Sequence, residues 1–530
     1  MTPQVTVMPE ERALIVDTGD PARILQQIPT AFQLDAANAP TFVGMPHDID
    51  TVARLALLQI PAPSPIEHYY RWPRELTMAP VVLAHQKASA AFLVTNPHSY
   101  CLNGIGTGKT LTALWAADYL MELGIVHRAL IDVPLSTLER VWGDALFFHF
   151  GHRTFSILYG SAEHRKKLLA QPKDFYILNH DGSQTIQREL EARSDIDLII
   201  VDELAVYRNR HNKWKSLNAI LYPEKGAPKP WVWGMTATPT PQEPTDAYHQ
   251  CRLITPTTVP KYYGQFRAMV MSHESQYVWV PRPEATRVVY DVMRPAVRYT
   301  REQCVDLPET MVQTRDVTMS AEQQKHYKEI QRELYTEIRG ARVTAVNTGV
   351  QISKLLQIAC GVVYDTQGTP HEIDAGNRIN TLLEIIEGID EKAIIFVPFT
   401  EVTNMLYREI SKHWSCAVVY GDVPKKERDQ IFGDFQSKDD PSILIAHPAC
   451  MAHGLTLTKA STIIWYAPIA SNETYQQSNG RITRIGQRYT ANIINMAGSA
   501  VERKIYKRLI ERQSGQTALL DMIEKGEDLL

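Results

Sequence analysis

The sequence lacks cysteine pairs at the short spacing that structural zinc sites and redox-active disulfides require. Its six cysteines stand alone: Cys101, Cys251, Cys304, Cys360, Cys416 and Cys450. We therefore expect buried thiols and no disulfide framework. No apolar run approaches the ~20 residues that a membrane-spanning helix needs, and the first residues carry acidic side chains and no signal-peptide core. These absences predict an intracellular, cytoplasmic protein.

A strong excess of either charge is also missing, because 55 basic and 59 acidic side chains leave a formal net charge of −4. A polyanion would have to bind a local basic surface, so composition neither indicates nor excludes nucleic-acid binding. Hydrophobic residues make up 44% and charged residues 22% of the chain, as in ordinary globular proteins. A length of 530 residues exceeds one ordinary core, so we expect two or three domains.

Short runs rich in valine, isoleucine and leucine occur in two parts of the chain and alternate with segments of helical pattern. They lie at residues 129–133, 155–159, 175–178, 196–201 and 231–235, and again at 393–397, 417–420, 443–446, 462–465 and 492–496. This alternation is typical of parallel sheets covered by helices on both faces. The sequence therefore predicts an α/β fold with two parallel-sheet domains in tandem.

Changes in composition and in hydrophobic pattern along the chain predict the domain boundaries. The predicted parts are a small N-terminal accessory domain at 1–75, a first sheet domain at 76–255, a linker and helical insertion at 256–365, and a second sheet domain at 366–530. Ser320 and Gln323 have capping-box spacing, which predicts a long helix reaching about Arg339. Ser499 and Glu502 mark another helix start in the same way.

A glycine-rich turn, GIGTGKT at residues 104–110, follows an apolar run and precedes a helical pattern. Glycines let backbone N–H groups converge on phosphate oxygens, and the following helix N-terminus favours the anion. The residues that we expect to bind nucleotide phosphates here are Gly106, Thr107, Gly108, Lys109 and Thr110. The strict form of the motif has glycine where this chain has Asn103, so the turn alone leaves an ordinary Gly/Thr loop as an equal alternative.

A second run, residues 198–203, ends an apolar strand pattern in Asp202 and Glu203. Asp202 is suited to a magnesium ion, which Thr110 would also bind, and Glu203 is suited to orient or deprotonate an attacking water. Such a pair is by itself more often a solvated turn. The order and separation of turn and carboxylates within one predicted α/β domain favour a nucleotide triphosphatase that uses Mg²⁺.

The order of motifs resembles the superfamily 2 helicases, including DEAD/DEAH-box ATPases, and within them the SWI/SNF-type DNA translocases, especially the compact phage and fork-remodelling forms. The resemblance spans residues 80–515. The matching strings are His85-Gln86, GIGTGKT, VPLSTLERVW (133–142), VDEL (201–204), MTATP (235–239), KAIIFVPF (392–399), Tyr420-Gly421-Asp422 with Arg428, HPACMAHGLTLTKAS (447–461) and QSNGRITRIGQ (477–487). It implies two RecA-like domains.

The resemblance also implies roles for further residues. Gln86 corresponds to the adenine-reading glutamine. Gln477, Arg481 and Arg484 would complete the catalytic site from the second domain, the two arginines on one face of a helix. The candidates for nucleic-acid contact and for coupling to hydrolysis are Ser136, Thr137, Thr236, Thr238, Gly454 and Thr456.

We accordingly expect a monomeric, ATP-dependent motor on double-stranded or branched DNA in a bacterial or phage-infected cell. RNA is a possible track, and replication or recombination proteins are possible partners. A strand-separating DNA or RNA helicase is the alternative, and a non-motor nucleotide-dependent module is a further one. The chain departs from the family pattern after Glu203, where Leu204-Ala205 stands in place of an ending in histidine, the residue that couples hydrolysis to the next motif in many relatives.

Overall fold

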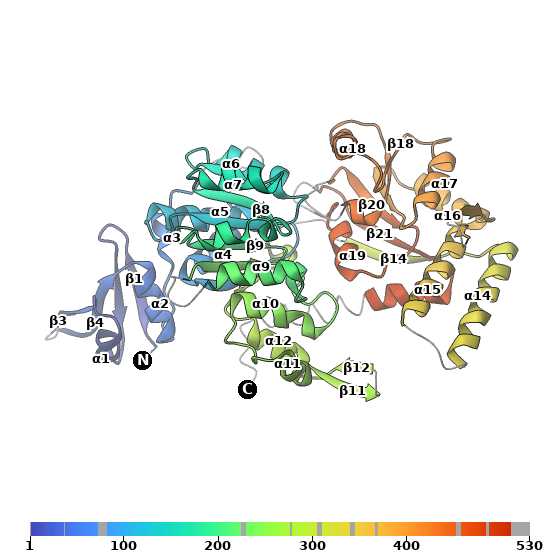
Figure 1. Cartoon of the computed structure of the whole chain (residues 1–530). Helices are drawn as coiled ribbons and strands as arrows, with labels where there is room; N and C mark the ends of the chain where they lie inside the picture. Colours follow the sequence, from blue (N-terminus) through green and yellow to red (C-terminus); the bar gives the residue numbers. More distant parts are fainter. Residues whose placement is uncertain are drawn as a thin grey trace. The chain divides into compact units, whose positions relative to one another are not determined.

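The computed structural model describes residues 2–35, 38–72, 82–223, 229–275, 278–304, 310–339, 345–365, 369–451, 457–483 and 487–509 (Figure 1). They fall into two compact units. Unit 1 holds the described residues up to Cys304, and unit 2 holds those from Thr310 onwards.

Unit 1 begins with a four-stranded antiparallel sheet of order β1-β2-β4-β3. Its elements are β1 (Gln4–Met8), β2 (Ala13–Asp17), α1 (Pro21–Gln27), β3 (Phe32–Asp35), β4 (Ala39–Pro46) and α2 (Ile49–Leu57). Asp20 and Asp48 cap the two helices by accepting hydrogen bonds from the amides of Arg23 and Thr51. Leu14, Ile24, Val43 and Leu55 belong to a separate small core between sheet and helices.

This N-terminal part is tied to the rest of unit 1 beside helix α5 (Lys109–Glu122). Tyr70, just after α3 (Pro65–Tyr69), donates its hydroxyl to Asp118 Oδ2 of α5 at 2.7 Å. Asp118 Oδ1 accepts from Arg153 Nε at 2.5 Å, so a buried carboxylate joins three segments. The aromatic ring of Trp72 packs edge-on against Trp115 of α5 at 5.7 Å between centroids.

The main sheet of unit 1 has seven strands in the order β13-β5-β10-β9-β6-β8-β7, all parallel. The strands are β5 (His98–Cys101), β6 (Ala129–Val133), β7 (Phe155–Ile157), β8 (Phe175–Asn179), β9 (Leu198–Asp202), β10 (Trp231–Met235) and β13 (Ala296–Val297). Successive strand residues point to opposite faces, and each face is buried in its own core cluster.

Helices cover both faces of this sheet (Figure 1). One face packs on α4 (Ala84–Thr95), α5 and α6 (Asp144–His149), and the other on α8 (Gln187–Glu191), α9 (Asn212–Leu221) and α10 (Ala247–Ile254). The remaining helical segments of this part are η1 (Leu138–Gly143), α7 (Ala162–Ala170), η2 (Gly182–Gln184), η3 (Leu204–Tyr207) and η4 (Pro244–Asp246).

The segment expected as a connector, residues 256–365, is divided between the two units. Its first part contains α11 (Tyr263–Val270), the hairpin β11 (Met271–Ser275) and β12 (Val278–Pro281), α12 (Ala285–Val292), β13 and α13 (Arg301–Cys304). Phe266 and Val289 lie in the core of unit 1, and β13 pairs with β5. Its second part begins with β14 (Thr310–Asp316), which pairs with β21 of the other sheet.

Unit 2 contains a six-stranded sheet of order β14-β21-β20-β17-β19-β18, again parallel. The strands besides β14 are β17 (Lys392–Phe396), β18 (Cys416–Val419), β19 (Ile443–Ala446), β20 (Ala460–Trp465) and β21 (Ala491–Ala497). Its other elements are α16 (Gly376–Glu387), α17 (Thr400–Ile410), α18 (Lys425–Ser437), η5 (Pro448–Met451), α19 (Asn472–Asn479) and a helix over 500–509.

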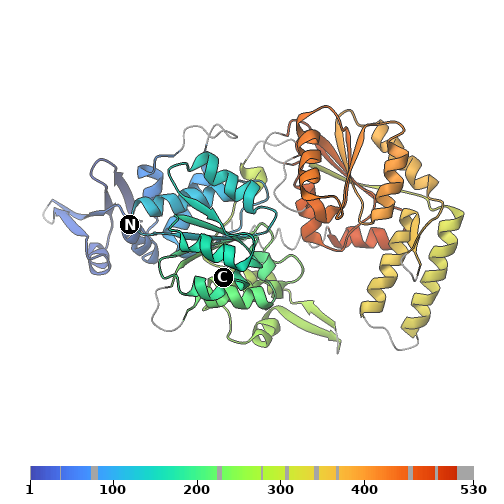
Figure 2. The same cartoon turned by 45° about the horizontal axis from the view of Figure 1, so that its top comes forward.

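A helical pair extends from this sheet domain, formed by α14 (Ala321–Arg339) and α15 (Ala345–Cys360), which lie side by side in Figure 2. The short hairpin β15 (Val362–Tyr364) and β16 (Pro370–Glu372) follows. The predicted capping box is confirmed, because Ser320 N donates to Gln323 Oε1 at 3.0 Å and Gln323 N donates to Ser320 Oγ at 3.2 Å.

A buried ion pair fastens helix 500–509 inside unit 2. Arg378 of α16 donates to Glu502 Oε1 at 2.7 Å, and both side chains are buried. The same guanidinium donates to the carbonyl oxygens of Tyr466 and Met496. Glu502 N donates to Ser499 Oγ at 3.2 Å, as the predicted helix start at Ser499 and Glu502 requires.

The predicted fold class is confirmed: two parallel-sheet domains, each covered by helices on both faces. All ten apolar runs predicted as strands overlap observed strands. Strands β5, β13 and β14 were not predicted from the apolar pattern. In the described part of the chain, no helix is both long enough and apolar enough to span a membrane.

Candidate functional site

Three chain segments leave the main sheet of unit 1 at the same edge. In the strand register, Cys101 at the end of β5 pairs with Met235 at the end of β10, and Met235 pairs with Asp202 at the end of β9. Because the strands are parallel, their carboxyl ends meet at one edge, where α/β proteins commonly bind ligands. The glycine-rich turn, the MTATP string and the carboxylate pair therefore emerge next to one another, as their order in the sequence predicts.

The glycine-rich turn adopts a conformation that only glycine accommodates readily. Gly106 and Gly108 have φ of 80° and 81°, and α5 begins directly afterwards at Lys109. A Cβ atom at Gly108 would collide with the side-chain amide of Gln86. Left-handed residues in such a turn direct successive N–H groups into a concave anion site, here at the N-terminus of a 14-residue helix.

Lys109 is held against the turn that it belongs to. Its Nζ donates to the carbonyl oxygens of Asn103 at 2.9 Å and Gly104 at 3.1 Å. Thr107 closes the turn by donating its hydroxyl to Gly104 O at 2.9 Å. The ammonium group therefore lies in the mouth of the turn, where a phosphate oxygen could replace a carbonyl oxygen as its partner. Thr110, the next residue, is half-buried at the same helix end.

His85 and Gln86 of α4 support the turn from the side. His85 Nε2 lies 2.9 Å from Thr107 O, and Gln86 Nε2 donates to the same oxygen at 3.3 Å. Gln86 Oε1 accepts from Leu83 N at 3.0 Å. Burial lowers the pKa of His85, which favours a neutral ring. Gln86 is thus in contact with the predicted phosphate turn, whereas its reading of adenine stays a prediction.

Asn103 explains why this turn tolerates a departure from the strict motif. Its Nδ2 donates to Ser89 Oγ of α4 at 2.8 Å, and its Oδ1 accepts from Tyr299 N at 2.8 Å. Tyr299 O in turn accepts from Gly104 N at 2.9 Å. A glycine at this position could make neither side-chain bond. Sequence reasoning treated Asn103 only as a mismatch, because its partners lie 14 and 196 positions away.

The carboxylate pair occupies a tightly held turn after β9. Asp202 Oδ2 accepts from the indole Nε1 of Trp142 at 2.9 Å, and Asp202 Oδ1 accepts from Glu203 N at 3.0 Å. Glu203 has φ 49° and ψ 51°, in the left-handed region that non-glycine residues seldom occupy. Backbone strain of this kind occurs often at functional sites.

The charges of Lys109 and Asp202 both act on the Cys101 thiol at the end of β5. Burial raises the pKa of the Cys101 thiol to about 11, with Lys109 lowering it and Asp202 raising it by their charges. The cation of the turn and the first carboxylate of the pair therefore act on the same strand end. A cation, oriented amides and a carboxylate suit a polyphosphate together with a divalent cation, which takes oxygen ligands.

The two threonines of the MTATP string are buried. Thr236 N donates to Cys101 O at 3.2 Å, and Thr236 Oγ1 accepts from Thr238 N at 3.1 Å. The hydroxyl of Thr238 has no hydrogen-bond partner among the residues that the structure describes. The structure thus brings both threonines to the edge that carries the phosphate turn, in hydrogen bonds that fix the local turn.

The VPLSTLERVW string follows β6 and carries Ser136 and Thr137. Ser136 is exposed, beside the exposed Leu135. Thr137 is buried and donates its hydroxyl to Pro134 O at 3.1 Å. Only Ser136 of the two thus presents its side chain to an external ligand, while Thr137 shapes the turn.

In unit 2, Gln477 and Arg481 are both buried. Gln477 Nε2 donates to Glu473 Oε1 at 3.4 Å on α19. The expectation that Arg481 lies on a helix is wrong, because α19 ends at Asn479 and Arg481 N donates to Ser478 O in the following turn. Gly480 at the helix end favours this termination. Arg484, Gly454 and Thr456 lie outside the described residues.

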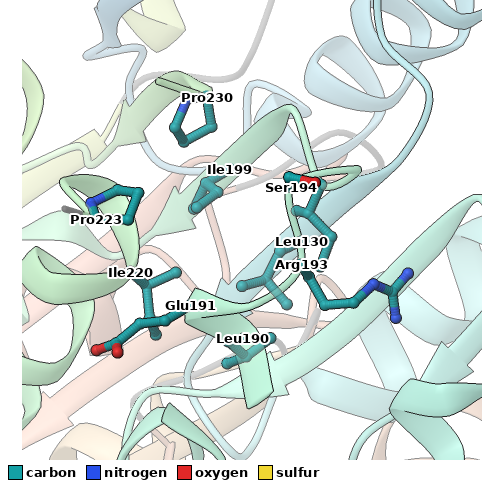
Figure 3. Close-up of a pocket in the computed structure, with 10 residues that line it drawn as sticks. Leu130, Leu190, Glu191, Arg193, Ser194, Ile199, Ile220, Pro223 and Pro230 are labelled. Atoms are coloured by element: carbon teal, nitrogen blue, oxygen red, sulfur yellow. The ribbon is translucent and has the colours of Figure 1, made fainter. Parts of the chain in front are cut away.

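A separate pocket lies at the opposite end of the unit 1 sheet (Figure 3). Leu130 and Ile199 line it from the second positions of β6 and β9, and Pro230 immediately precedes β10. Glu191 and Arg193 stand at its rim. This pocket is therefore at the amino ends of the strands and is not part of the site built on the phosphate turn.

This arrangement defines the class: a protein of two parallel α/β sheet domains, the first with a phosphate-type turn and a carboxylate pair at its carboxyl edge. The SNF2-related domain matches residues 85–362, and the helicase conserved C-terminal domain matches residues 377–486. The chain belongs to the SNF2-related family. The resemblance to SWI/SNF-type members of superfamily 2 is thereby confirmed.

Individual relatives are distant. The chain is 27% identical over 43% of its length to YwqA of Bacillus subtilis, named for an ATP-dependent helicase/translocase, and spans only 25% of that protein. It is 22% identical to protein p41 of Acyrthosiphon pisum secondary endosymbiont phage 1, over 79% of this chain and 93% of that one. A solved Sulfolobus solfataricus SWI2/SNF2 ATPase core in complex with dsDNA is 18% identical, with a TM-score of 0.41, over 86% of this chain and 96% of that one.

Proposed function

We propose that this protein is an ATP-dependent motor that moves along double-stranded DNA and remodels forks, branched DNA or DNA-bound proteins. The observation that carries the proposal is the shared carboxyl edge of β5, β10 and β9, where the turn with Lys109 and the pair Asp202-Glu203 emerge together. Membership of the SNF2-related family supports the same activity.

Within this proposal, the turn at Gly106 to Gly108 binds the ATP phosphates through backbone N–H groups, and Lys109 neutralises their charge. Thr110 and Asp202 would hold Mg²⁺, which when bound offsets the negative charge that develops on the phosphates. Glu203 orients the attacking water and accepts its proton. Two observations support the fit: the turn has the positive φ of Gly106 and Gly108 directly before α5, and Lys109 already lies in the mouth of the turn.

We assign the remaining catalytic roles to unit 2. Gln477, Arg481 and Arg484 would contribute donors to the transition state of hydrolysis, as the motif resemblance implies. Their planar guanidinium and amide groups suit equatorial phosphate oxygens. Hydrolysis would thereby depend on the arrangement of the two domains. Each cycle of ATP hydrolysis would then be coupled to a domain movement.

DNA is the proposed track. Ser136, Gly454 and Thr456 would contact the phosphate backbone through amides and hydroxyls, without reading base sequence. Thr137, Thr236 and Thr238 would shape the segments between this contact and the carboxylates. The phage relative p41 supports a bacterial or phage-infected cell as the setting. A monomer acting in the cytoplasm is part of the proposal.

ATP hydrolysis measured without nucleic acid and with single-stranded DNA, duplex DNA, a fork and RNA tests this function. We expect the largest stimulation with duplex or forked DNA. The motor is then assayed by displacement of a third strand from a blunt triplex, and unwinding by release of a labelled strand from a fork. Triplex displacement without strand release supports a translocase; strand release supports the helicase alternative, and hydrolysis unaffected by any nucleic acid contradicts both.

A further inference from the structure

The segment 132–142 touches the carboxylate turn of unit 1 at two buried points, one at each end of that turn. The first is Trp142, whose indole donates to Asp202. The second is Asp132, which accepts from the hydroxyl of Tyr207 in η3. The exposed Ser136, a proposed DNA contact, lies between the two points in the sequence.

At the first point, Trp142 joins a backbone turn to a carboxylate oxygen. The carbonyl oxygen of Thr137 accepts from the amides of both Val141 and Trp142 at 3.1 Å, so the backbone of Trp142 is fixed to the segment next to Ser136. The Trp142 side chain is 0% exposed, and its Nε1 reaches Asp202 Oδ2 at 2.9 Å. A hydrogen bond to a charged, half-buried carboxylate contributes more than one between neutral groups.

At the second point, three polar side chains meet in the interior. The Tyr207 hydroxyl donates to Asp132 Oδ2, and His180 Nδ1 lies 3.1 Å from the same oxygen. The rings of His180 and Tyr207 pack edge to face, with 5.3 Å between their centroids. All three residues are buried. Burial, followed by the charge of Asp132, raises the pKa of Tyr207, so its hydroxyl stays protonated as a donor.

Between these anchors lies the strained residue. Glu203, with φ 49°, directly follows Asp202, and Tyr207 ends the helical turn that comes next. The turn is thus clamped at Asp202 and at Tyr207 by groups of a single segment. Buried, well-packed hydrogen bonds resist gradual deformation. Displacement of the 135–137 loop would therefore either move the turn from Asp202 to Tyr207 or break one of these bonds.

We propose that Trp142 is a positioning residue that transmits occupancy of the 135–137 loop by DNA backbone to Asp202 and Glu203, with the Asp132–His180–Tyr207 cluster as the second anchor. The inference rests on the proposed function and names the route by which DNA stimulates hydrolysis. It also accounts for Leu204-Ala205, because a route through segment 132–142 does not need a histidine after the carboxylates.

A matched control exists within the same unit. Trp233 of β10 is also 0% exposed and also donates from its indole Nε1, but to Asn96 O at 3.3 Å, at the C-terminal end of α4. Replacing either tryptophan by phenylalanine removes one buried donor and a similar volume. Only Trp142→Phe removes the bond to Asp202.

The experiment compares wild type, Trp142→Phe and Trp233→Phe. We expect Trp142→Phe to lower the DNA-stimulated kcat tenfold or more while DNA affinity changes less than twofold. Hydrogen exchange, measured without nucleotide, provides a readout independent of turnover: DNA slows exchange over residues 202–208 in wild type and in Trp233→Phe, and this slowing is absent in Trp142→Phe. Equal losses in both tryptophan variants would overturn the proposal in favour of general packing.

Tyr207→Phe is a second variant that leaves no cavity, since it removes only a hydroxyl. We expect a smaller loss of DNA stimulation, about threefold, with unchanged DNA affinity. The two levels of failure are distinguishable. A wild-type protein whose hydrolysis ignores DNA contradicts the proposed function, whereas strong stimulation that survives intact in Trp142→Phe contradicts only the route proposed here.

Discussion

The two parallel sheets share one construction but use their charged residues differently. In unit 1, Lys109, Asp202 and Glu203 collect at the carboxyl edge of the sheet, none of them among its fully buried residues. In unit 2, the ion pair of Arg378 and Glu502 is buried in the interior and joins α16 to the helix over 500–509. The comparison separates two uses of charge: the three residues at the carboxyl edge of the first sheet are open to the ligand that we propose, whereas the buried pair of unit 2 stabilises the fold.

The largest expected effect comes from removing a charge at the proposed ligand site of unit 1. Lys109→Ala removes the cation from the phosphate turn, and we expect hydrolysis to fall by about 1,000-fold or more, equivalent to roughly 4 kcal/mol of transition-state stabilisation. The melting temperature should change little, because among the described residues the Lys109 ammonium group donates to carbonyl oxygens at its own turn. Phosphate release and a thermal melt measure both quantities. A variant that unfolds would show that Lys109 is structural.

The next largest effect concerns the stability that the buried ion pair gives to unit 2. Arg378→Met leaves Glu502 charged and buried without its ion-pair partner, which costs about 3–5 kcal/mol. Urea unfolding followed by circular dichroism measures the loss. Arg503→Met is the control, since Arg503 pairs with Asp316 at 2.8 Å in a pair that is more than half exposed, and we expect little change. Equal stability of the two variants would refute a structural role for the buried pair.

A smaller effect, on ATP affinity, is expected at a glycine of positive φ, and a second such glycine of unit 1 serves as its control. Gly108→Ala places a methyl group against Gln86, and we expect ATP affinity to fall about tenfold, roughly 1.4 kcal/mol. Gly124→Ala has a similar φ of 67° with no atom within 4 Å of the added Cβ, so it carries backbone strain of about 1–2 kcal/mol without touching the site. Nucleotide titration separates the two variants. Loss of affinity in both would mean that strain alone is responsible.

The smallest effect concerns a property that the two units share, namely a buried cysteine thiol. Burial raises the pKa of Cys101 in unit 1 to about 11 and that of Cys360 in unit 2 to about 12. A raised pKa keeps a thiol protonated, so at pH 8 about a thousandth or less of either is thiolate. Iodoacetamide followed by mass spectrometry should label the half-exposed Cys304 and Cys450 first. Rapid labelling of Cys101 in the folded protein would contradict its burial at the strand end.

The fold could be predicted from the sequence wherever an element is long or apolar. The strand at 129–133 and the capping box at Ser320 are signals carried by neighbouring residues. Strands β13 and β14 escaped prediction for a physical reason. β13 has two residues, and β14 has mostly exposed side chains, so each depends on pairing with a distant strand and not on its own apolar pattern.

The candidate site could be predicted only where its residues are neighbours in the sequence. Residues 104–110 and Asp202-Glu203 form local patterns, and the structure brings them to one edge. The bond from Trp142 to Asp202 spans 60 positions, and a buried tryptophan looks the same in sequence whether it only packs or also donates. The helix expected at Arg481 failed because Gly480 ends α19.

The most direct test of the central claim is phosphate release by Glu203→Gln on saturating duplex DNA, with ATP binding measured in parallel by a fluorescent analogue. The substitution keeps the size of the side chain and removes the proton acceptor. We predict that the variant binds ATP as tightly as the wild type and releases phosphate only at background rate. Turnover at the wild-type rate would contradict the assignment of this sheet edge as the hydrolytic site.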